Sequence, residues 1–222
     1  MDIIIQKSAF RRFSLGHDNK NCFLETIMRY ILASKSPRRR EILQNIGLDF
    51  TVFTADTDES SSITDPAALV KELSLRKGRA TADELSKKGE LSADDIIISS
   101  DTVVAYDCEI LGKPRDRDDA RRMLKLLSGK KHRVLSGIAL IKGDASFVSY
   151  SETFVYFNEL DDALIERYLD TAEPYDKAGA YGIQGIASVW VDRIEGSYLG
   201  VVGLPVSLLD KLHRECTGSS IF

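Results

Sequence analysis

The stretch Asp95-Ile-Ile-Ile-Ser-Ser-Asp-Thr-Val-Val104 decides the fold. Three consecutive isoleucines followed by small hydroxyl residues and a carboxylate are typical of a buried strand that carries its polar end to an edge of a sheet. In open α/β sheets, ligands bind outside the carboxyl ends of the strands, so Asp101 falls where chemistry is usually placed. The alternative is that Ser99 to Asp101 forms only a turn between two strands.

The composition around this stretch is that of a folded protein. The chain has 222 residues, of which 43% are hydrophobic, enough for one sizeable domain or two small lobes with a real core. No apolar run approaches the roughly 18 residues that a membrane span needs, so we expect no membrane partner. A formal net charge of -4 argues against generic binding to nucleic acid.

The cysteines and the N-terminus bear on location and domain boundaries. Cys22, Cys108 and Cys216 are widely spaced and form no CxxC pair, which argues against a disulfide scaffold and a zinc site. We therefore expect a reducing, cytoplasmic compartment. Residues 1–27 show little periodicity, and Met28 directly precedes a clean strand signal. The sequence predicts an extension or upstream start at 1–27 and one domain at 28–222.

An anion site is predicted directly after the first strand, expected at residues 29–34. Ser36 and Pro37 are typical of the start of a helix, with serine as the N-cap and proline at the first helical position. Three arginines, residues 38–40, follow in the first turn, where cations oppose the helix dipole. Such an unfavourable arrangement suggests a bound anion such as phosphate, although a solvated basic face is the alternative.

Carboxylates and a lysine follow in the next two elements. A second strand, at 49–54, leads into Asp56-Thr-Asp-Glu59, which would hold Mg²⁺ or Mn²⁺ if it faced a phosphate and would otherwise be a polar loop. The spacing of apolar residues predicts a helix from Asp65 to about Lys88. Lys77 falls on its buried side, where it either extends to solvent or waits for a phosphate.

Further elements follow from turn residues and periodicity. Gly112-Lys113-Pro114 lets the backbone approach a ligand, but no Walker-type phosphate loop occurs in the chain. A loop of 13 residues with three glycines, 173–185, is more often functional than structural. The other predicted elements are a hairpin at 105–111, a helix from about Asp116, a long antiparallel hairpin of 132–141 with 147–157, a helix at 161–170, strands at 187–194 and 199–202, and a helix at 204–214.

Five segments in the same order give the chain a close resemblance to the Maf family. They are Leu32-Ala-Ser-Lys-Ser-Pro-Arg-Arg39, Ser100-Asp-Thr-Val-Val104, Gly112-Lys-Pro114, Asp176-Lys-Ala-Gly-Ala-Tyr-Gly-Ile-Gln-Gly185, and Gly196-Ser-Tyr198 through Val202-Gly-Leu-Pro205. The resemblance covers Met28 to the last helix. It implies an α/β fold of the Maf/ITPase-like kind, with a mixed, curved sheet flanked by helices and two lobes around a deep cleft.

The resemblance also implies an activity and its residues. Family members are nucleoside triphosphate pyrophosphatases, house-cleaning hydrolases that use a divalent metal cation to release a nucleoside monophosphate and pyrophosphate. Asp101 is then the proton acceptor that activates water. Asp58 or Glu59 is the metal partner beside Asp101. The substrate-binding and specificity residues implied are Ser34, Arg38, Arg39, Lys77, Thr102, Lys113, Lys177 and Gln184.

Three motif positions within the family distinguish its branches, and here they are Arg38, Thr102 and Gln184. This combination is similar to the branch that acts on dTTP, UTP and modified pyrimidine nucleotides. The amide of Gln184 offers a donor and an acceptor, which suits the edge of uracil or thymine. The alternatives are the branch that acts on 7-methyl-GTP and a nucleotide-binding regulator of septum formation without essential turnover. The resemblance further implies a homodimer.

Overall fold

The computed structural model describes residues 28–222, so the predicted extension at 1–27 lies outside the described residues. The elements are β1 (Tyr30–Leu32), α1 (Pro37–Asn45), β2 (Phe50–Val52), α2 (Pro66–Lys87), β3 (Ile96–Tyr106), β4 (Glu109–Leu111), α3 (Arg117–Leu127), β5 (Lys131–Lys142), β6 (Ala145–Phe157), α4 (Asp162–Leu169), the 3-10 turns η1 (Pro174–Asp176), η2 (Ala178–Ala180) and η3 (Ile186–Trp190), β7 (Val191–Glu195), α5 (Tyr198–Val202) and α6 (Val206–Thr217).

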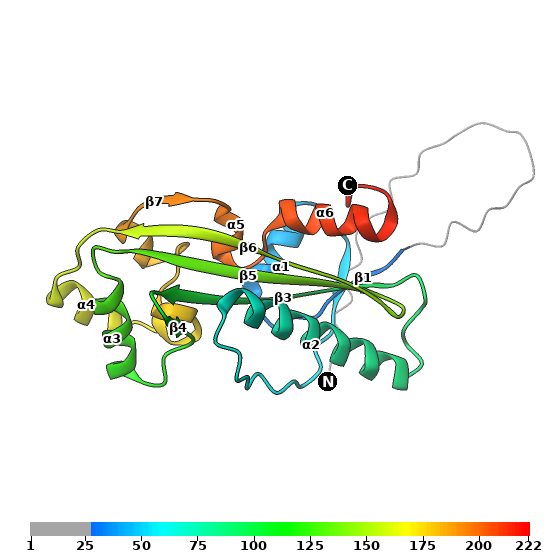
Figure 1. Cartoon of the computed structure of the whole chain (residues 1–222), viewed down its shortest axis with the longest axis horizontal. Helices are drawn as coiled ribbons and strands as arrows, with labels where there is room; N and C mark the ends of the chain where they lie inside the picture. The colour runs from blue at the N-terminus through cyan, green and yellow to red at the C-terminus, as the bar shows by residue number, and fades with distance from the viewer. Residues whose placement is uncertain (1–27) are drawn as a thin grey trace, which may run out of the picture.

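A mixed seven-stranded sheet forms the centre of the fold. Its order is β2-β1-β3-β5-β6-β7, with β4 also paired to β3. Strand β1 is parallel to β2 and β3, and the other neighbours are antiparallel. Helix α2 packs on β3 and β5, whereas α6 packs on β5 and β6 from the opposite face (Figure 1). The prediction of a mixed α/β sheet flanked by helices is confirmed.

Two lobes share the long strands β3, β5 and β6, which run through the length of the molecule (Figure 1). One lobe contains β1, β2, α1, α2 and α6, and its buried clusters include Leu43, Ile98 and Leu209. The other contains β4, β7, α3 and α4 around a core that includes Leu124 and Trp190. In residues 28–222, no helix is long and apolar enough to cross a bilayer.

The predicted starts of α1, α2 and α3 are confirmed, and each of these helices has a local cap. The Ser36 hydroxyl accepts a hydrogen bond from the backbone N–H of Arg39 at the start of α1. The carboxylates of Asp65 and Asp116 cap α2 and α3 in the same way. An N-cap of this kind satisfies a backbone donor that the helix itself leaves free, typically contributing about 1 kcal/mol. These starts can therefore be read from a few adjacent residues.

Strand β3 corrects the first expectation. The strand does not end at Ser99–Thr102 but continues to Tyr106, because β5 pairs with it over nearly its whole length. The pairing on its other edge is interrupted instead, since β1 pairs with β3 only up to Ile98 and β4 pairs with β3 only from Val104 onward. Residues 99–103 therefore lie within a strand that has one open edge, so Asp101 is held by a ladder, and neither a turn nor a strand end is present there.

Two C-terminal predictions also need correction. Residues 199–202 form helix α5 instead of a strand, because the Ser197 hydroxyl accepts the N–H of Gly200 as an N-cap and Gly203, at φ 122°, ends the helix. The predicted strand at 187–194 begins only at Val191, after the turn η3. The predicted loop at 173–185 contains the two short turns η1 and η2.

The core of the second lobe contains a buried histidine that should make stability depend on pH. His132 is 1% exposed, its Nε2 lies 2.8 Å from the Tyr181 hydroxyl, and its ring packs edge-on against Phe157. Burial lowers the pKa of His132 from 6.5 to about 4. Between pH 6.5 and pH 4 the unfolded chain binds a proton at this residue that the folded protein does not. The free energy of unfolding therefore decreases as the pH is lowered through this window.

We expect this residue to contribute a loss of about 3 kcal/mol in the free energy of unfolding between pH 6.5 and pH 4. Urea unfolding at several pH values, for the wild type and for His132→Gln, measures it, because the variant lacks this titration and retains every other one. Equal pH slopes in the two proteins would contradict the assignment.

Candidate active site

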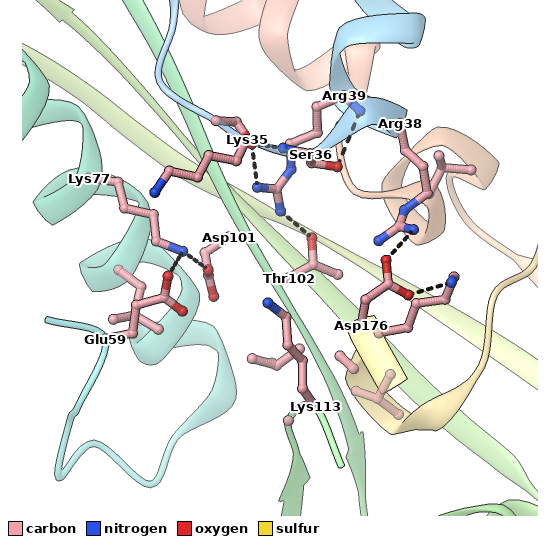
Figure 2. Close-up of a pocket in the computed structure, with 18 of the residues that line it drawn as sticks. Lys35, Ser36, Arg38, Arg39, Glu59, Lys77, Asp101, Thr102, Lys113 and Asp176 are labelled. Atoms are coloured by element: carbon pink, nitrogen blue, oxygen red, sulfur yellow. Dashed lines mark hydrogen bonds and ion pairs between the residues drawn. The ribbon is translucent and has the colours of Figure 1, made fainter. Parts of the chain in front are cut away.

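The open edge of β3 forms the floor of a cleft of about 750 Å³. Its walls come from α1, α2, the loop after β4 and the loop that contains η1 and η2 (Figure 2). The cleft brings together ten of the predicted site residues, which are Ser34, Arg38, Arg39, Glu59, Lys77, Asp101, Thr102, Lys113, Lys177 and Gln184. Residues up to 150 positions apart in the sequence, such as Ser34 and Gln184, thus line one space.

Lys77 joins two carboxylates at one side of the cleft. Its Nζ lies 2.6 Å from Oδ1 of Asp101 and 3.0 Å from Oε1 of Glu59. The side chains of Lys77 and Asp101 are 16% and 11% exposed, so little solvent separates them. The prediction that Lys77 points to the buried side of α2 is confirmed, and its partner there is Asp101. The ammonium group orients the carboxylate toward the cleft.

Arg39 holds the walls of the cleft together. Its Nε donates to the carbonyl of Gly203 at 2.9 Å, Nη1 donates to the Ser34 hydroxyl at 3.1 Å and Nη2 donates to the Thr102 hydroxyl at 3.2 Å. Burial lowers the pKa of Arg39 from its usual value. The guanidinium fork thereby links α1, β3 and the end of α5, and its predicted contact with substrate stays a prediction.

The hydroxyl of Thr102 is fixed by a chain of hydrogen bonds that sequence reasoning missed. Ser136, the register partner of Thr102 on β5, donates to the carbonyl of Gly200 at 2.7 Å. Its oxygen can then only accept from Thr102, at 2.8 Å. The Thr102 hydroxyl also accepts from Arg39, so its proton and one of its lone pairs are already engaged by other residues of the protein. Only strand register, which the sequence does not state, would have identified Ser136.

An acidic residue lies between two of the predicted cations. Oδ2 of Asp176 is 3.3 Å from Nη1 of Arg38, and Oδ1 is 2.5 Å from Nζ of Lys177 (Figure 2). Burial opposes ionisation of Asp176, but the hydrogen bond and charge of Lys177, with Arg38, outweigh it and lower the pKa of this carboxyl. Asp176 therefore bridges α1 and the η1 turn across the cleft.

Two predicted residues extend into the cleft with their polar groups free. Lys113 points toward Asp101 and Thr102 (Figure 2). Within residues 28–222, neither Lys113 nor Gln184 makes a hydrogen bond or ion pair through its side chain. An unpaired ammonium and an unpaired amide in one cleft are suited to a ligand that carries both anionic and hydrogen-bonding groups.

The two candidate metal carboxylates of the loop after β2 differ in direction. Asp58 accepts from the backbone N–H and the hydroxyl of Ser60, which lower its pKa, and it does not line the cleft. Glu59 and Asp101 do line it. In the described part of the chain no three His, Cys, Asp or Glu side chains group as a metal site. Two carboxylates facing a phosphate nevertheless match how Mg²⁺ is usually held, through one or two carboxylates and substrate oxygens.

These features define the class of the site, a cleft for an anionic ligand with a positioned carboxylate. The chain belongs to the family described as "Maf-like protein", whose sequence model matches residues 29–216. The resemblance predicted from five motifs is therefore confirmed.

Individual relatives are similar over most of their length. The dTTP/UTP pyrophosphatase of Alkaliphilus oremlandii is 51% identical over 188 residues, which cover 83% of this chain and 94% of the relative. That of Thermoanaerobacter sp. (strain X514) is 47% identical over 191 residues, 85% of this chain and 97% of the relative. A solved structure, the Staphylococcus aureus Ham1 protein, aligns with a TM-score of 0.40 and 14% identity over 58% of this chain and 71% of that one.

Proposed function

We propose that this protein hydrolyses dTTP and UTP, and modified pyrimidine nucleotides, to the monophosphate and pyrophosphate. The observation that carries the proposal is the cleft in which Asp101 lies 2.6 Å from Lys77 and faces the free ammonium of Lys113. Membership of the Maf-like family and the names of the relatives support this activity.

In the proposed reaction, Asp101 accepts a proton from a water molecule while the oxygen of that water forms a bond to the α-phosphorus. The bond from the α-phosphorus to the oxygen bridging it to the β-phosphorus breaks, and pyrophosphate leaves with that oxygen. Phosphoryl transfer needs mainly positioning and neutralisation of charge. Arg38 and Lys113 supply positive charge, and Lys77 orients Asp101.

We further propose that Glu59 and Asp101 hold a divalent cation together with the phosphate oxygens. Their oxygens already share Lys77 as a partner, so both carboxylates reach one point of the cleft. When bound, Mg²⁺ or Mn²⁺ would polarise the phosphate oxygens and neutralise developing charge. Asp58 is less suited to this role because both of its oxygens are engaged by Ser60.

The base is proposed to lie against the loop that carries Gln184. Its free amide can donate to O4 and accept from N3–H of uracil or thymine. A cytoplasmic location, a homodimer, and the absence of nucleic acid and membrane partners stay predictions.

A substrate panel tests the proposal. We expect pyrophosphate release with Mg²⁺ to be fastest from dTTP and UTP, and slower by about tenfold or more from CTP, GTP and 7-methyl-GTP. Cytosine reverses the donor and the acceptor that the glutamine amide meets, and the two purines are larger than a pyrimidine. Activity confined to 7-methyl-GTP would assign the protein to the other branch. Nucleotide binding without release from any of the five would favour the non-hydrolysing regulator.

A further inference from the structure

The turn that carries Gln184 is closed by two glycines. The N–H of Gly185 donates to the carbonyl of Gly182 at 3.0 Å, with Ile183 and Gln184 between them. Gln184 lines the cleft, and its amide has no partner within residues 28–222. Within residues 28–222 no hydrogen bond or ion pair holds the side chain, so where its amide lies depends on the conformation of this turn.

Glu173 packs directly against both ends of the turn. A Cβ added at Gly185 would lie 2.3 Å from both carboxylate oxygens of Glu173. A Cβ added at Gly182 would lie 2.7 Å from Cε of Lys177 and 3.3 Å from Oε1 of Glu173. Neither position needs a left-handed backbone, since neither has a positive φ. At Gly185 the missing side chain leaves room for the carboxylate of Glu173, and at Gly182 it leaves room mainly for Lys177, with Glu173 next to it.

The carboxylate also hydrogen-bonds the segment that follows the turn. Oε2 of Glu173 accepts from the N–H of Ile186 at 3.0 Å, and Oε1 accepts from the hydroxyl of Tyr168 at 3.1 Å. Within the described chain it has no ion-pair partner among the lysines and arginines, so its hydrogen bonds are to neutral donors. Tyr168 is 2% exposed, and its ring packs edge-on against Trp190. The turn is thereby anchored to the rigid aromatic core of the second lobe.

The backbone of Glu173 is tied to the phosphate side of the cleft. Its carbonyl accepts from Nζ of Lys177 at 2.7 Å, and the same ammonium pairs with Asp176 at 2.5 Å. Glu173 thus contacts the turn with its side chain and the predicted phosphate-binding lysine with its main chain. A change at this residue is transmitted to the orientation of Gln184 first, because the side chain is what contacts the turn.

We infer that Glu173 is a positioning residue that sets how Gln184 meets the base, and through it the preference for uracil over cytosine. This inference rests on the proposed function. UTP and CTP differ at positions 3 and 4 of the base, the two positions that a glutamine amide can contact. A misplaced amide should therefore reduce the discrimination between UTP and CTP more than it reduces the rate of hydrolysis.

The test compares Glu173→Ala, Glu173→Gln, Gln184→Ala and the double variant Glu173→Ala/Gln184→Ala. We expect Glu173→Ala to lower the ratio of kcat/KM for UTP over CTP by about tenfold, as Gln184→Ala does, with no further loss in the double variant. Glu173→Gln should keep most of the preference, because its carbonyl can accept from Ile186 and its amide can donate to the Tyr168 oxygen. Glu195→Ala is the matched control, since Glu195 accepts from Tyr156 at 2.9 Å on the same lobe.

Unchanged discrimination in Glu173→Ala, or losses that add in the double variant, would overturn the inference. Amide hydrogen exchange gives a readout that does not depend on catalysis. The N–H of Ile186 should exchange at least about tenfold faster in Glu173→Ala than in the wild type or Glu195→Ala. If the wild type releases no pyrophosphate, the proposed function fails, and unchanged exchange at Ile186 would separately reject Glu173 as the anchor of the turn.

Discussion

Asp101→Asn is expected to lower the rate of pyrophosphate release from UTP by about a thousandfold. The amide has nearly the same shape, but it cannot take the proton of the attacking water. It also leaves Lys77 with Glu59 as its only carboxylate partner within the described residues. The loss should appear mainly in kcat, because Arg38, Lys113 and Gln184, which are proposed to contact the phosphates and the base directly, remain in place.

Single-turnover hydrolysis measures the rate, and calorimetric titration with a non-hydrolysable UTP analogue measures binding in the same variant. Asp192→Asn is the control, since Asp192 is an exposed residue of β7 outside the cleft. Hydrolysis by Asp101→Asn within tenfold of the wild type would reject Asp101 as the proton acceptor.

Gly137→Ala is expected to lower the free energy of unfolding by about 3 kcal/mol. Gly137 lies on β5 in register with Asp101, and α2 crosses directly over it. An added Cβ would lie 2.2 Å from the carbonyl oxygen of Val70 and 2.5 Å from its carbonyl carbon. These are backbone atoms of α2, so the helix has to move away from the sheet and takes Lys77 away from Asp101.

Activity should therefore fall together with stability. Urea unfolding measures the first effect, and UTP hydrolysis under conditions where the variant is folded measures the second. Gly89→Ala is the matched control, because its φ of 68° costs backbone strain of about 1 kcal/mol while its Cβ would meet no atom within 4 Å. A loss in Gly137→Ala no larger than in Gly89→Ala would contradict the steric explanation.

Local signals predicted much of the fold. Ser36, Asp65 and Asp116 mark helix starts because an N-cap depends only on adjacent residues. The prediction of a strand at 199–202 was wrong because an apolar composition is also compatible with one helical turn. The N-cap at Ser197 favours the helix. The interruption between β1 and β4 depends on the pairing of distant strands, which composition and periodicity do not contain.

The candidate site divides in the same way. Residue chemistry and motif order predicted which side chains line the cleft, including Lys77 and Gln184. They did not predict how these side chains are held. The bridge by Asp176 and the hydroxyl of Ser136 act across long sequence separations, and the carboxylate of Glu173 acts through the conformation of the loop that follows it. Glu59 lines the cleft, whereas the neighbouring Asp58 accepts a hydrogen bond from Ser60. This difference depends on the conformation of the loop, which the residue types alone do not give.

The continuous strands β3, β5 and β6 make the two sides of the cleft unequal. They cross both lobes without interruption, so opening the lobes against each other would strain two long hydrogen-bonded ladders, β3 with β5 and β5 with β6. The side that carries Gln184 is braced by Glu173, whereas residues 53–65, which carry Glu59, have no regular secondary structure. We therefore expect the side that carries Glu59 to adjust to a bound molecule more readily than the side that carries Gln184. Under the proposed function, the base would then meet the braced side of the cleft, and the triphosphate would meet the side that can adjust.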